Sequence, residues 1–253
     1  MGSYIFGSEY HYTVTTLTRE VRAEIIETLI QSCRALYREV PSVHNPNPMG
    51  HFSARIPGTD EIVIKPRNVG WNKVTVDDMI TFKLDYRKVS GPDYEIVEIP
   101  IHIEMYRARA EISAVVHTHQ TYATLMGTLG LKLELLDPNT LAFTNGIPTY
   151  DELDDPTYLT KEIGTLIRNE AQGRIAARKI GSSNALILKA HGPVIVGKSV
   201  EEACMLTIAL ENAVKAQMMA AMIGGSRPPI ESLGIASRTP SPNLWRSLIR
   251  SYL

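Results

Sequence analysis

Two histidines separated by one residue follow a short apolar run near the middle of the chain. The run covers residues 114–116, and His117 and His119 come directly after it. Successive side chains of an extended strand point to opposite faces, so residues two apart share a face. His117 and His119 can therefore present two imidazoles to one metal ion.

A third imidazole follows another apolar run. Residues 184–190 have the pattern of a strand, and His191 comes next, before a turn signal of Gly192 and Pro193. Three neutral imidazoles that leave a coordination position open are typical of a catalytic zinc-type site. A lone pair of spaced histidines is more often hydrogen-bonded in a core or on a surface, so other residues must support the metal site.

Glu98 and the segment after it supply that support. Glu98 precedes an apolar-rich, helix-like segment that contains Tyr106 and Arg109 and leads into the run before His117. The order Glu, Tyr-x-x-Arg, Ala-Val-Val-His-x-His and, much later, His-Gly resembles the signature of the class II aldolase/adducin superfamily, typified by fuculose phosphate aldolase. The resemblance extends from the first long helix to about residue 225.

The resemblance implies a metal site and a reaction class. His117, His119 and His191 correspond to the metal ligands, with zinc as the first candidate ion and manganese, iron or cobalt as alternatives. A divalent ion chelated by two substrate oxygens stabilises the enediolate or carbanion left when a neighbouring carbon–carbon bond breaks. Glu98 corresponds to the catalytic acid/base carboxylate of the family.

The chain departs from the phosphate-using members at three places. Ile96 and Val97 stand where those members have two serines directly before the glutamate. Residues 50–53 only partly match an Asn-x-Ser turn, and residues 65–68 lack the Thr-Gly element. We therefore predict a substrate without a phosphate.

Arg67 suggests a carboxylic acid instead, because a guanidinium can bind a carboxylate through two hydrogen bonds. Alone it is as readily explained by a surface ion pair. Asn68, Ser53 and His51 are further candidates for substrate binding. His102, on the helix after Glu98, is a candidate to orient the glutamate or a metal ligand, although a hydrogen-bonded helix histidine explains it equally well.

The function predicted from these residues is a metal-dependent carbon–carbon lyase, an aldolase or a decarboxylase, acting on an unphosphorylated hydroxy, keto or aromatic acid. A non-haem iron(II) oxygenase that oxidatively decarboxylates an aryl keto acid is the alternative, because it would use the same three histidines. A non-catalytic, adducin-like interaction domain is a third possibility, although adducin heads lack the metal histidines. The resemblance also implies a homotetramer with the active site at a subunit interface.

Composition allows such an enzyme without singling it out. The chain has 253 residues, 44% of them hydrophobic, which suits one α/β domain over residues 1–253, with a core of about 18–225 and a tail of 226–253. The formal charge of −1, from 26 basic and 27 acidic residues, favours neither nucleic acid nor an anionic membrane as a partner. Cys33 and Cys204 lie in helix-like patterns and suit buried thiols. The first residues lack a signal-peptide pattern and no apolar run is long enough to span a membrane, so a cytoplasmic location is expected.

The patterns of apolar residues predict a mixed, mainly antiparallel sheet flanked by helices, as in the three-layer α/β/α class II aldolase fold. Helices are expected at 18–40, from Pro100 toward the His117 strand, at 122–127, at 155–180, and after a Ser199–Glu202 capping box. Strands are expected at 50–56, 61–65, 79–84, 94–98 and 184–190, and the first four follow so closely that antiparallel pairing is favoured. The segment 226–242 is expected to be loosely ordered.

Overall fold

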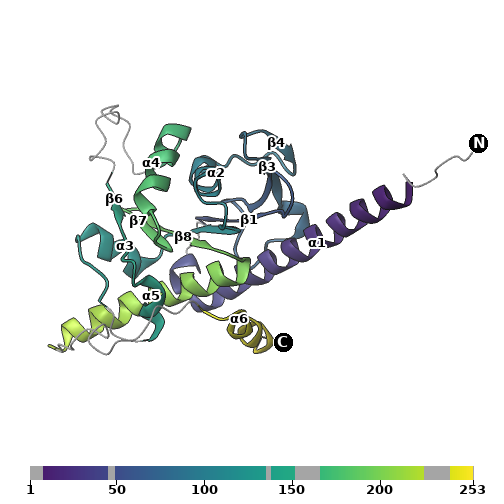
Figure 1. Ribbon diagram of the computed structural model, residues 1–253. Coiled ribbons are helices and arrows are strands. Elements are labelled where there is room, and N and C mark those ends of the chain that lie inside the picture. Colours follow the sequence, from purple (N-terminus) through teal and green to yellow (C-terminus); the bar gives the residue numbers. More distant parts are fainter. Residues whose placement is uncertain (1–7, 45–48, 135–137, 152–165, 225–239, 253) are drawn as a thin grey trace, which may run out of the picture.

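The computed structural model describes residues 8–44, 49–134, 138–151, 166–224 and 240–252, and its centre is an eight-stranded sheet (Figure 1). The strand order is β4-β3-β2-β1-β5-β8-β7-β6. Every neighbouring pair is antiparallel except β6 and β7, which are parallel. The mixed, mainly antiparallel sheet is thereby confirmed. The strands are β1 His51–Arg55, β2 Glu61–Lys65, β3 Ile80–Lys83, β4 Lys88–Ser90, β5 Ala114–His117, β6 Thr149–Tyr150, β7 Ala185–Leu188 and β8 Gly192–Gly197.

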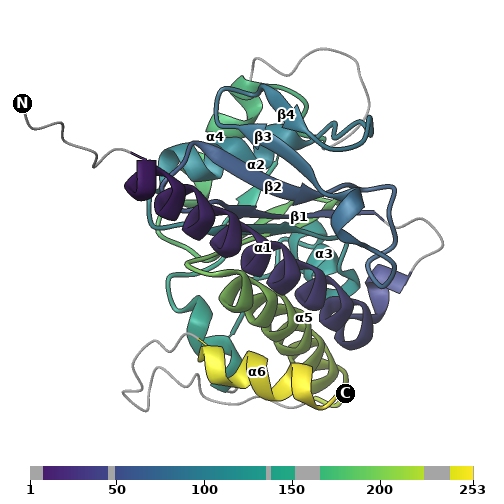
Figure 2. The same ribbon diagram turned by 90° about the vertical axis from the view of Figure 1, so that its right-hand side faces the viewer.

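Helices cover both faces of the sheet, which makes the predicted three layers (Figures 1 and 2). On one face α1 and α5 pack against strand side chains such as Phe52, Val116 and Ile187. On the other, α2 and α4 pack against the alternate side chains, such as Val115 and Leu186. The period of two in each strand therefore builds two separate cores. The helices are α1 Ser8–Glu39, α2 Ile99–Ala108, α3 Thr121–Thr128, α4 Glu170–Ile180, α5 Val200–Met222 and α6 Pro242–Arg250, with short 3-10 helices at Pro41–His44, Val76–Asp78 and Pro138–Phe143.

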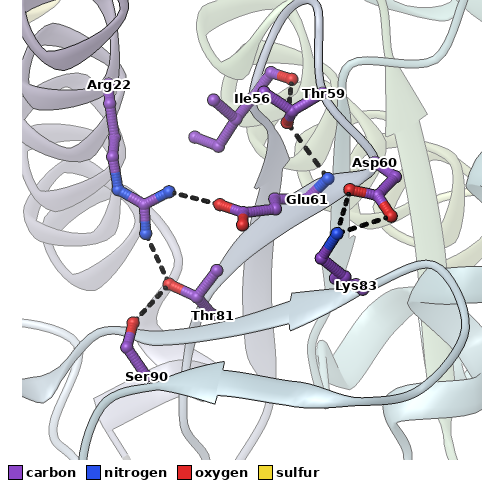
Figure 3. A network of polar contacts seen from close by, with 8 residues as sticks. All are labelled: Arg22, Ile56, Thr59, Asp60, Glu61, Thr81, Lys83 and Ser90. Carbon is purple, nitrogen blue, oxygen red and sulfur yellow. Dashed lines mark hydrogen bonds and ion pairs between the residues drawn. The ribbon is translucent and has the colours of Figure 1, made fainter. Parts of the chain in front are cut away.

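Helix α1 is longer than the predicted 18–40 but buries the expected stripe. Its inward side chains recur at three-to-four spacing and include Ile26, Leu29, Ile30, Cys33 and Leu36, all buried. Polar side chains add to this packing at the edge of the stripe. Figure 3 shows Arg22 reaching from α1 to Glu61 on β2 and Thr81 on β3.

Residues 94–98, predicted to be a strand, are not part of the sheet. Their backbone is irregular and then makes a turn into α2. Pro100 is the second residue of that helix rather than the first. Ile96 is buried in a small cluster with Ile64 and Ile80. The apolar alternation that predicted a strand thus reflects packing of a loop onto the sheet.

The predicted helix over 155–180 begins only at Glu170 within the described residues. Residues 166–168 are irregular, and residues 152–165 lie outside the part of the chain that the structure describes. The Asn169 side chain accepts a hydrogen bond from the Gln172 amide, and the Gln172 side chain accepts one from the Asn169 amide, each at 3.0 Å. This reciprocal cap starts the helix at that point.

The other predicted elements are close to those observed. Helix α3 and strand β7 differ from the predicted 122–127 and 184–190 by one or two residues at an end. At the start of α5 the Ser199 hydroxyl accepts from the Glu202 amide as expected, but the Glu202 carboxylate accepts from the Lys198 amide, so only half of the predicted capping box forms. Residues 225–239 lie outside the described residues. Beyond them α6, which was not predicted, buries Trp245, whose Nε1 donates to the Ser32 hydroxyl.

Cys33 and Cys204 are buried free thiols, as predicted. Among the described helices, each falls short of the combined length and apolar character that crossing a membrane requires.

Candidate metal centre

The sheet brings the three predicted ligands together. His117 ends β5, His119 lies two residues beyond it, and His191 lies between β7 and β8. Because β5 pairs with β8, with His117 opposite Val194, the start of β8 holds His191 beside His117. One nitrogen from each of these imidazoles lies within 4.8 Å of the others. The three rings have centroids 4.6, 4.7 and 5.2 Å apart.

One ring nitrogen of His117 is fixed by the backbone. Its Nδ1 lies 3.0 Å from the Pro193 carbonyl oxygen, and a carbonyl can only accept, so Nδ1 carries the proton. The other nitrogen, Nε2, is buried without a hydrogen-bond partner. A buried imidazole nitrogen in this state is suited to coordinate a metal ion, and the carbonyl on the opposite side orients the ring. The donor set and this orphaned atom therefore fit a divalent metal ion.

His117 and His119 are held in the neutral form that metal binding requires. Burial, the adjacent His191 and the positive Arg67 lower the pKa of His119 to about 4. Burial and the neighbouring imidazoles His191, His119 and His51 keep the pKa of His117 well below its usual value. Neutral imidazoles bind a metal ion without first releasing a proton.

His191 lies in a tight hairpin turn that explains the glycine after it. The His191 amide donates to the Leu188 carbonyl at 3.0 Å, and Ala190 has a left-handed φ of 54°. A Cβ at Gly192 would lie 2.2 Å from the carbonyl oxygen of Thr118, the residue between the other two ligands. A glycine is required because two backbone segments that carry candidate ligands meet there.

Glu98 lies beside the triad at the start of α2. Its Oε2 is 3.6 Å from His117 Nε2 and its Oε1 is 3.8 Å from His191 Nδ1. The carboxylate does not cap its own helix. Burial raises its pKa to about 7, opposed by a hydrogen bond from the Ile167 backbone and by the charges of Arg67 and Arg168. A carboxyl group poised in this way can exchange a proton with a group bound at the triad.

Of the residues predicted to bind substrate, Arg67 and His51 lie nearest to the centre. The positive charge of Arg67 lowers the pKa of Glu98, His119 and His51, so its guanidinium lies within electrostatic range of all three. Arg67 is partly exposed. His51 begins β1 opposite His117, and the two rings are stacked with centroids 5.8 Å apart.

Of three other predicted residues, two are held in a buried cluster and one lies at the surface. Ser53 is fully buried, and its hydroxyl pairs with His102 Nδ1 at 2.7 Å and the Tyr106 hydroxyl at 2.8 Å. His102 is buried as well and contacts the ring of His51, with centroids 5.6 Å apart, rather than Glu98 or a ligand. The side chain of Asn68 is exposed. His102 thus contacts His51, and Ser53 holds His102 in place.

The Tyr-x-x-Arg part of the signature also has a positioning role. Tyr106 joins α2 to β1 through Ser53, and the Arg109 guanidinium donates to the carbonyls of Gly181 and Ser183 before β7. The two side chains therefore connect α2 to both halves of the sheet.

Sequence reasoning missed Ile167 and Arg168 as neighbours of Glu98. Both lie in the segment that was predicted to be helical. The backbone N–H of a residue inside a helix bonds to the carbonyl four residues earlier, so Ile167 would not be available to Glu98 there. The Asn169 cap was the sequence signal that could have placed them outside the helix.

Comparisons with known proteins agree with this fold. The sequence profile of the family described as "Class II Aldolase and Adducin N-terminal domain" matches residues 27–218. The chain is 26% identical over 179 residues to the Meiotically up-regulated gene 14 protein of Schizosaccharomyces pombe, a match covering 70% of this chain and 66% of that protein. It is 25% identical over 177 residues to the L-ribulose-5-phosphate 4-epimerase UlaF of Salmonella paratyphi C, covering 67% of this chain and 75% of that protein.

A solved structure shows the same fold. L-fuculose 1-phosphate aldolase from Glaciozyma antarctica PI12 matches with a TM-score of 0.67 at 20% identity, covering 99% of this chain and 86% of that chain. The chain belongs to the class II aldolase and adducin N-terminal domain family. This family groups metal-dependent lyases and epimerases, and the present chain carries a histidine triad that can hold a metal ion.

Proposed function

We propose that the protein is a divalent-metal-dependent carbon–carbon lyase, an aldolase or a decarboxylase, acting on an unphosphorylated hydroxy, keto or aromatic carboxylic acid. The observation that carries the proposal is the convergence of three imidazoles beside the buried carboxylate of Glu98. His117, through Nε2, His119 and His191 would hold the ion. A zinc-type ion bound by three imidazoles supplies a Lewis acid that withdraws electron density from a chelated hydroxy-carbonyl or carboxylate group.

Glu98 is proposed to move the proton that either reaction needs. Its two carboxylate oxygens face nitrogens of His117 and His191, so a group held by the triad would lie within its reach. With 5% of its surface exposed, the residue is shielded from bulk water, which limits competing proton exchange. The Ile167 backbone amide donates a hydrogen bond to the carboxylate, and the positive charge of Arg168 favours its ionised form.

The substrate class follows from the residues around Glu98. Ile96 packs in a buried apolar cluster, and Val97 beside it also lacks a hydroxyl, so neither residue can bind a phosphate through its side chain. Arg67 provides a positive charge near Glu98, His119 and His51, which suits a carboxylate. Two relatives described above are named for sugar phosphates, so this chain would differ from them in substrate.

The homotetramer with a shared active site is part of the proposal, as is a cytoplasmic location. Two buried free thiols are consistent with a reducing compartment. Zinc is the proposed ion, and manganese, iron or cobalt would suit the same imidazoles.

The test combines metal content with turnover. Wild type and His119→Ala are purified without oxygen and analysed by elemental mass spectrometry. They are then assayed against panels of hydroxy, keto and aromatic acids and of sugar phosphates. About one zinc, manganese or cobalt per wild-type chain, absent from the variant, with cleavage or decarboxylation of an unphosphorylated acid, is the expected result.

Other outcomes redirect the assignment. Iron together with oxygen consumption on aryl keto acids would favour the iron(II) oxygenase, which uses the same histidines. Turnover of sugar phosphates alone would overturn the proposed substrate, and interconversion of epimers without cleavage would indicate an epimerase. A wild-type chain that takes up no metal even on reconstitution would favour the adducin-like interaction domain.

A further inference from the structure

Helix α3 begins two residues after the ligand His119, and its own N-cap residue does not cap it. Gln120 occupies the N-cap position without a side-chain cap bond. Its Nε2 instead donates to the Thr207 carbonyl of α5 at 2.7 Å, and the residue is fully buried. The first N–H groups of a helix lack partners within the helix, so they must find an acceptor elsewhere.

Glu211 of α5 supplies that acceptor. One carboxylate oxygen accepts from the Tyr122 amide at 3.2 Å and the other from the Ala123 amide at 3.1 Å. Glu211 is only 5% exposed, and a negative charge at this position also interacts favourably with the helix dipole. Thr207 and Glu211 are one turn apart on the same face of α5. One helix face therefore holds both Gln120 and the start of α3.

The other side of α3 contacts the strand and turn that carry the third ligand. A Cβ at Gly127 would lie 2.2 Å from Ile187 Cγ2, so α3 packs on β7 as closely as its backbone allows. The Thr124 hydroxyl donates to the His191 carbonyl at 3.4 Å. Helix α3 thus connects His119, just before it, with His191, beside it.

We propose that Glu211 is a positioning residue that fixes α3 and thereby sets the distance between His119 and His191, and with it the affinity for the metal ion. The inference rests on the proposed function in taking these histidines as ligands. Without the carboxylate, the partly buried N–H of Tyr122 and the buried N–H of Ala123 lose their acceptors, and the first turn of α3 must shift or open to water. That shift displaces backbone that is only two residues from His119 in the sequence.

Two substitutions remove the contact of Glu211 with α3 in part and in full. Glu211→Gln keeps one oxygen acceptor but turns an amide NH₂ toward the second backbone N–H. Glu211→Ala removes both acceptors. Glu201→Gln is the matched control, because Glu201 lies in the first turn of the same helix.

The experiment measures cobalt(II) and zinc affinity of the full chain by competition with a chromophoric chelator. Visible spectra of the cobalt(II) forms, thermal melting of the metal-free proteins and hydrogen exchange over residues 119–128 are recorded in parallel. We expect Glu211→Gln to bind both ions roughly 10-fold more weakly and Glu211→Ala up to about 100-fold, as is usual when a partner of a ligand-bearing segment is lost. The cobalt(II) spectrum should change, and exchange at the start of α3 should speed up, while Glu201→Gln matches wild type.

The outcomes distinguish this inference from the proposed function. Unchanged affinity and spectrum in Glu211→Gln, with wild type binding metal, would overturn the positioning role alone. Failure of wild type to bind metal would overturn both. If Glu211→Ala does not fold, Glu211→Gln still decides, because faster exchange with unaltered metal affinity and spectrum would show a purely structural role.

Discussion

At the scale of single residues, Lys65 shows how burial without an opposite charge lowers the pKa of an ammonium group. Lys65 is fully buried, with its ammonium over the Trp71 ring, and burial lowers its pKa to about 8. Its Nζ donates to the carbonyls of Pro66 and Gly50. Lys65 therefore anchors both the segment that carries Arg67 and the segment that leads into His51.

The two cysteines give a test at this scale. Burial raises the pKa of the Cys33 thiol to about 12 and that of Cys204 still higher. At pH 8 a thiol of pKa 12 is ionised in about one molecule in ten thousand, and the thiolate is the reactive form. We expect neither cysteine to react with a disulfide reagent in the native protein within an hour, and both to react in denaturant. Fast reaction of the folded chain, followed by absorbance, would contradict this burial.

At the scale of elements, the metal centre depends on how closely two backbone segments approach. The turn between β7 and β8 carries His191, and the segment after β5 carries His119. They meet where Gly192 lies against the Thr118 carbonyl. The His-Gly pair is thus a packing requirement of the hairpin as well as a mark of the family.

Gly192→Ala tests this close approach. The added methyl would lie 2.2 Å from a backbone oxygen, which cannot rotate away as a side chain can. We expect the free energy of unfolding to fall by about 2 kcal/mol or more, as for overpacked cores, and metal affinity to fall as well. Chemical denaturation and chelator competition measure the two effects. Gly70→Ala is the control, because its Cβ would meet only side-chain atoms of Asn72 and Lys73.

Polar contacts of Arg22 attach α1 to strands β2 and β3 (Figure 3). Arg22 donates to Glu61 Oε2 at 2.8 Å and to the Thr81 hydroxyl at 2.6 Å, and Thr81 also accepts from Ser90. The Arg22 and Glu61 side chains are 29% and 22% exposed. A planar guanidinium serves two acceptors at once, which an ammonium does less well.

We expect Arg22→Ala to lower the free energy of unfolding by about 1 kcal/mol and Arg22→Lys to recover only part of it. Lys83→Ala provides the comparison, because Lys83 pairs with Asp60, which is 56% exposed, and should change stability by no more than a few tenths of a kcal/mol. Urea denaturation of the three variants measures the differences. Equal losses in the free energy of unfolding for Arg22→Ala and Lys83→Ala would show that contacting both β2 and β3 gives Arg22 no extra stabilising effect.

At the scale of the whole molecule, the candidate ligands join distant parts of the chain. His117, His119 and His191 lie at one end of the β5–β8 pair, and Glu98 comes from the helix layer on the other side of the sheet from α1. Binding of an ion to such a site favours the folded state, because the unfolded chain has no preformed site.

Metal removal should therefore lower thermal stability. A ligand at 100 times its dissociation constant stabilises a protein by about 2.7 kcal/mol. For a chain of this size that corresponds to a melting temperature roughly 5 to 10 °C higher than in the metal-free protein. Scanning calorimetry of chelator-treated and zinc-reconstituted protein measures the shift. His119→Ala, as control, should show little or no shift, and a full shift in that variant would exclude His119 as a ligand.

Sequence alone determined the features that rest on local pattern. Short β-type runs in close succession predicted β1, β2 and β3 and their antiparallel pairing, and the three-to-four spacing predicted α1. The His-x-His spacing, together with the resemblance of Glu98 and the His-Gly pair to the family signature, identified the candidate centre. The tertiary structure decided what depends on contacts between distant residues. In the folded chain residues 94–98 are a loop packed on the sheet, Ile167 and Arg168 lie beside Glu98, and Ser53 is buried against His102. Glu211 accepts hydrogen bonds at the start of α3. None of these contacts follows from residue spacing. Each joins segments that are far apart in the sequence, and these segments meet only when the helices and the sheet pack together.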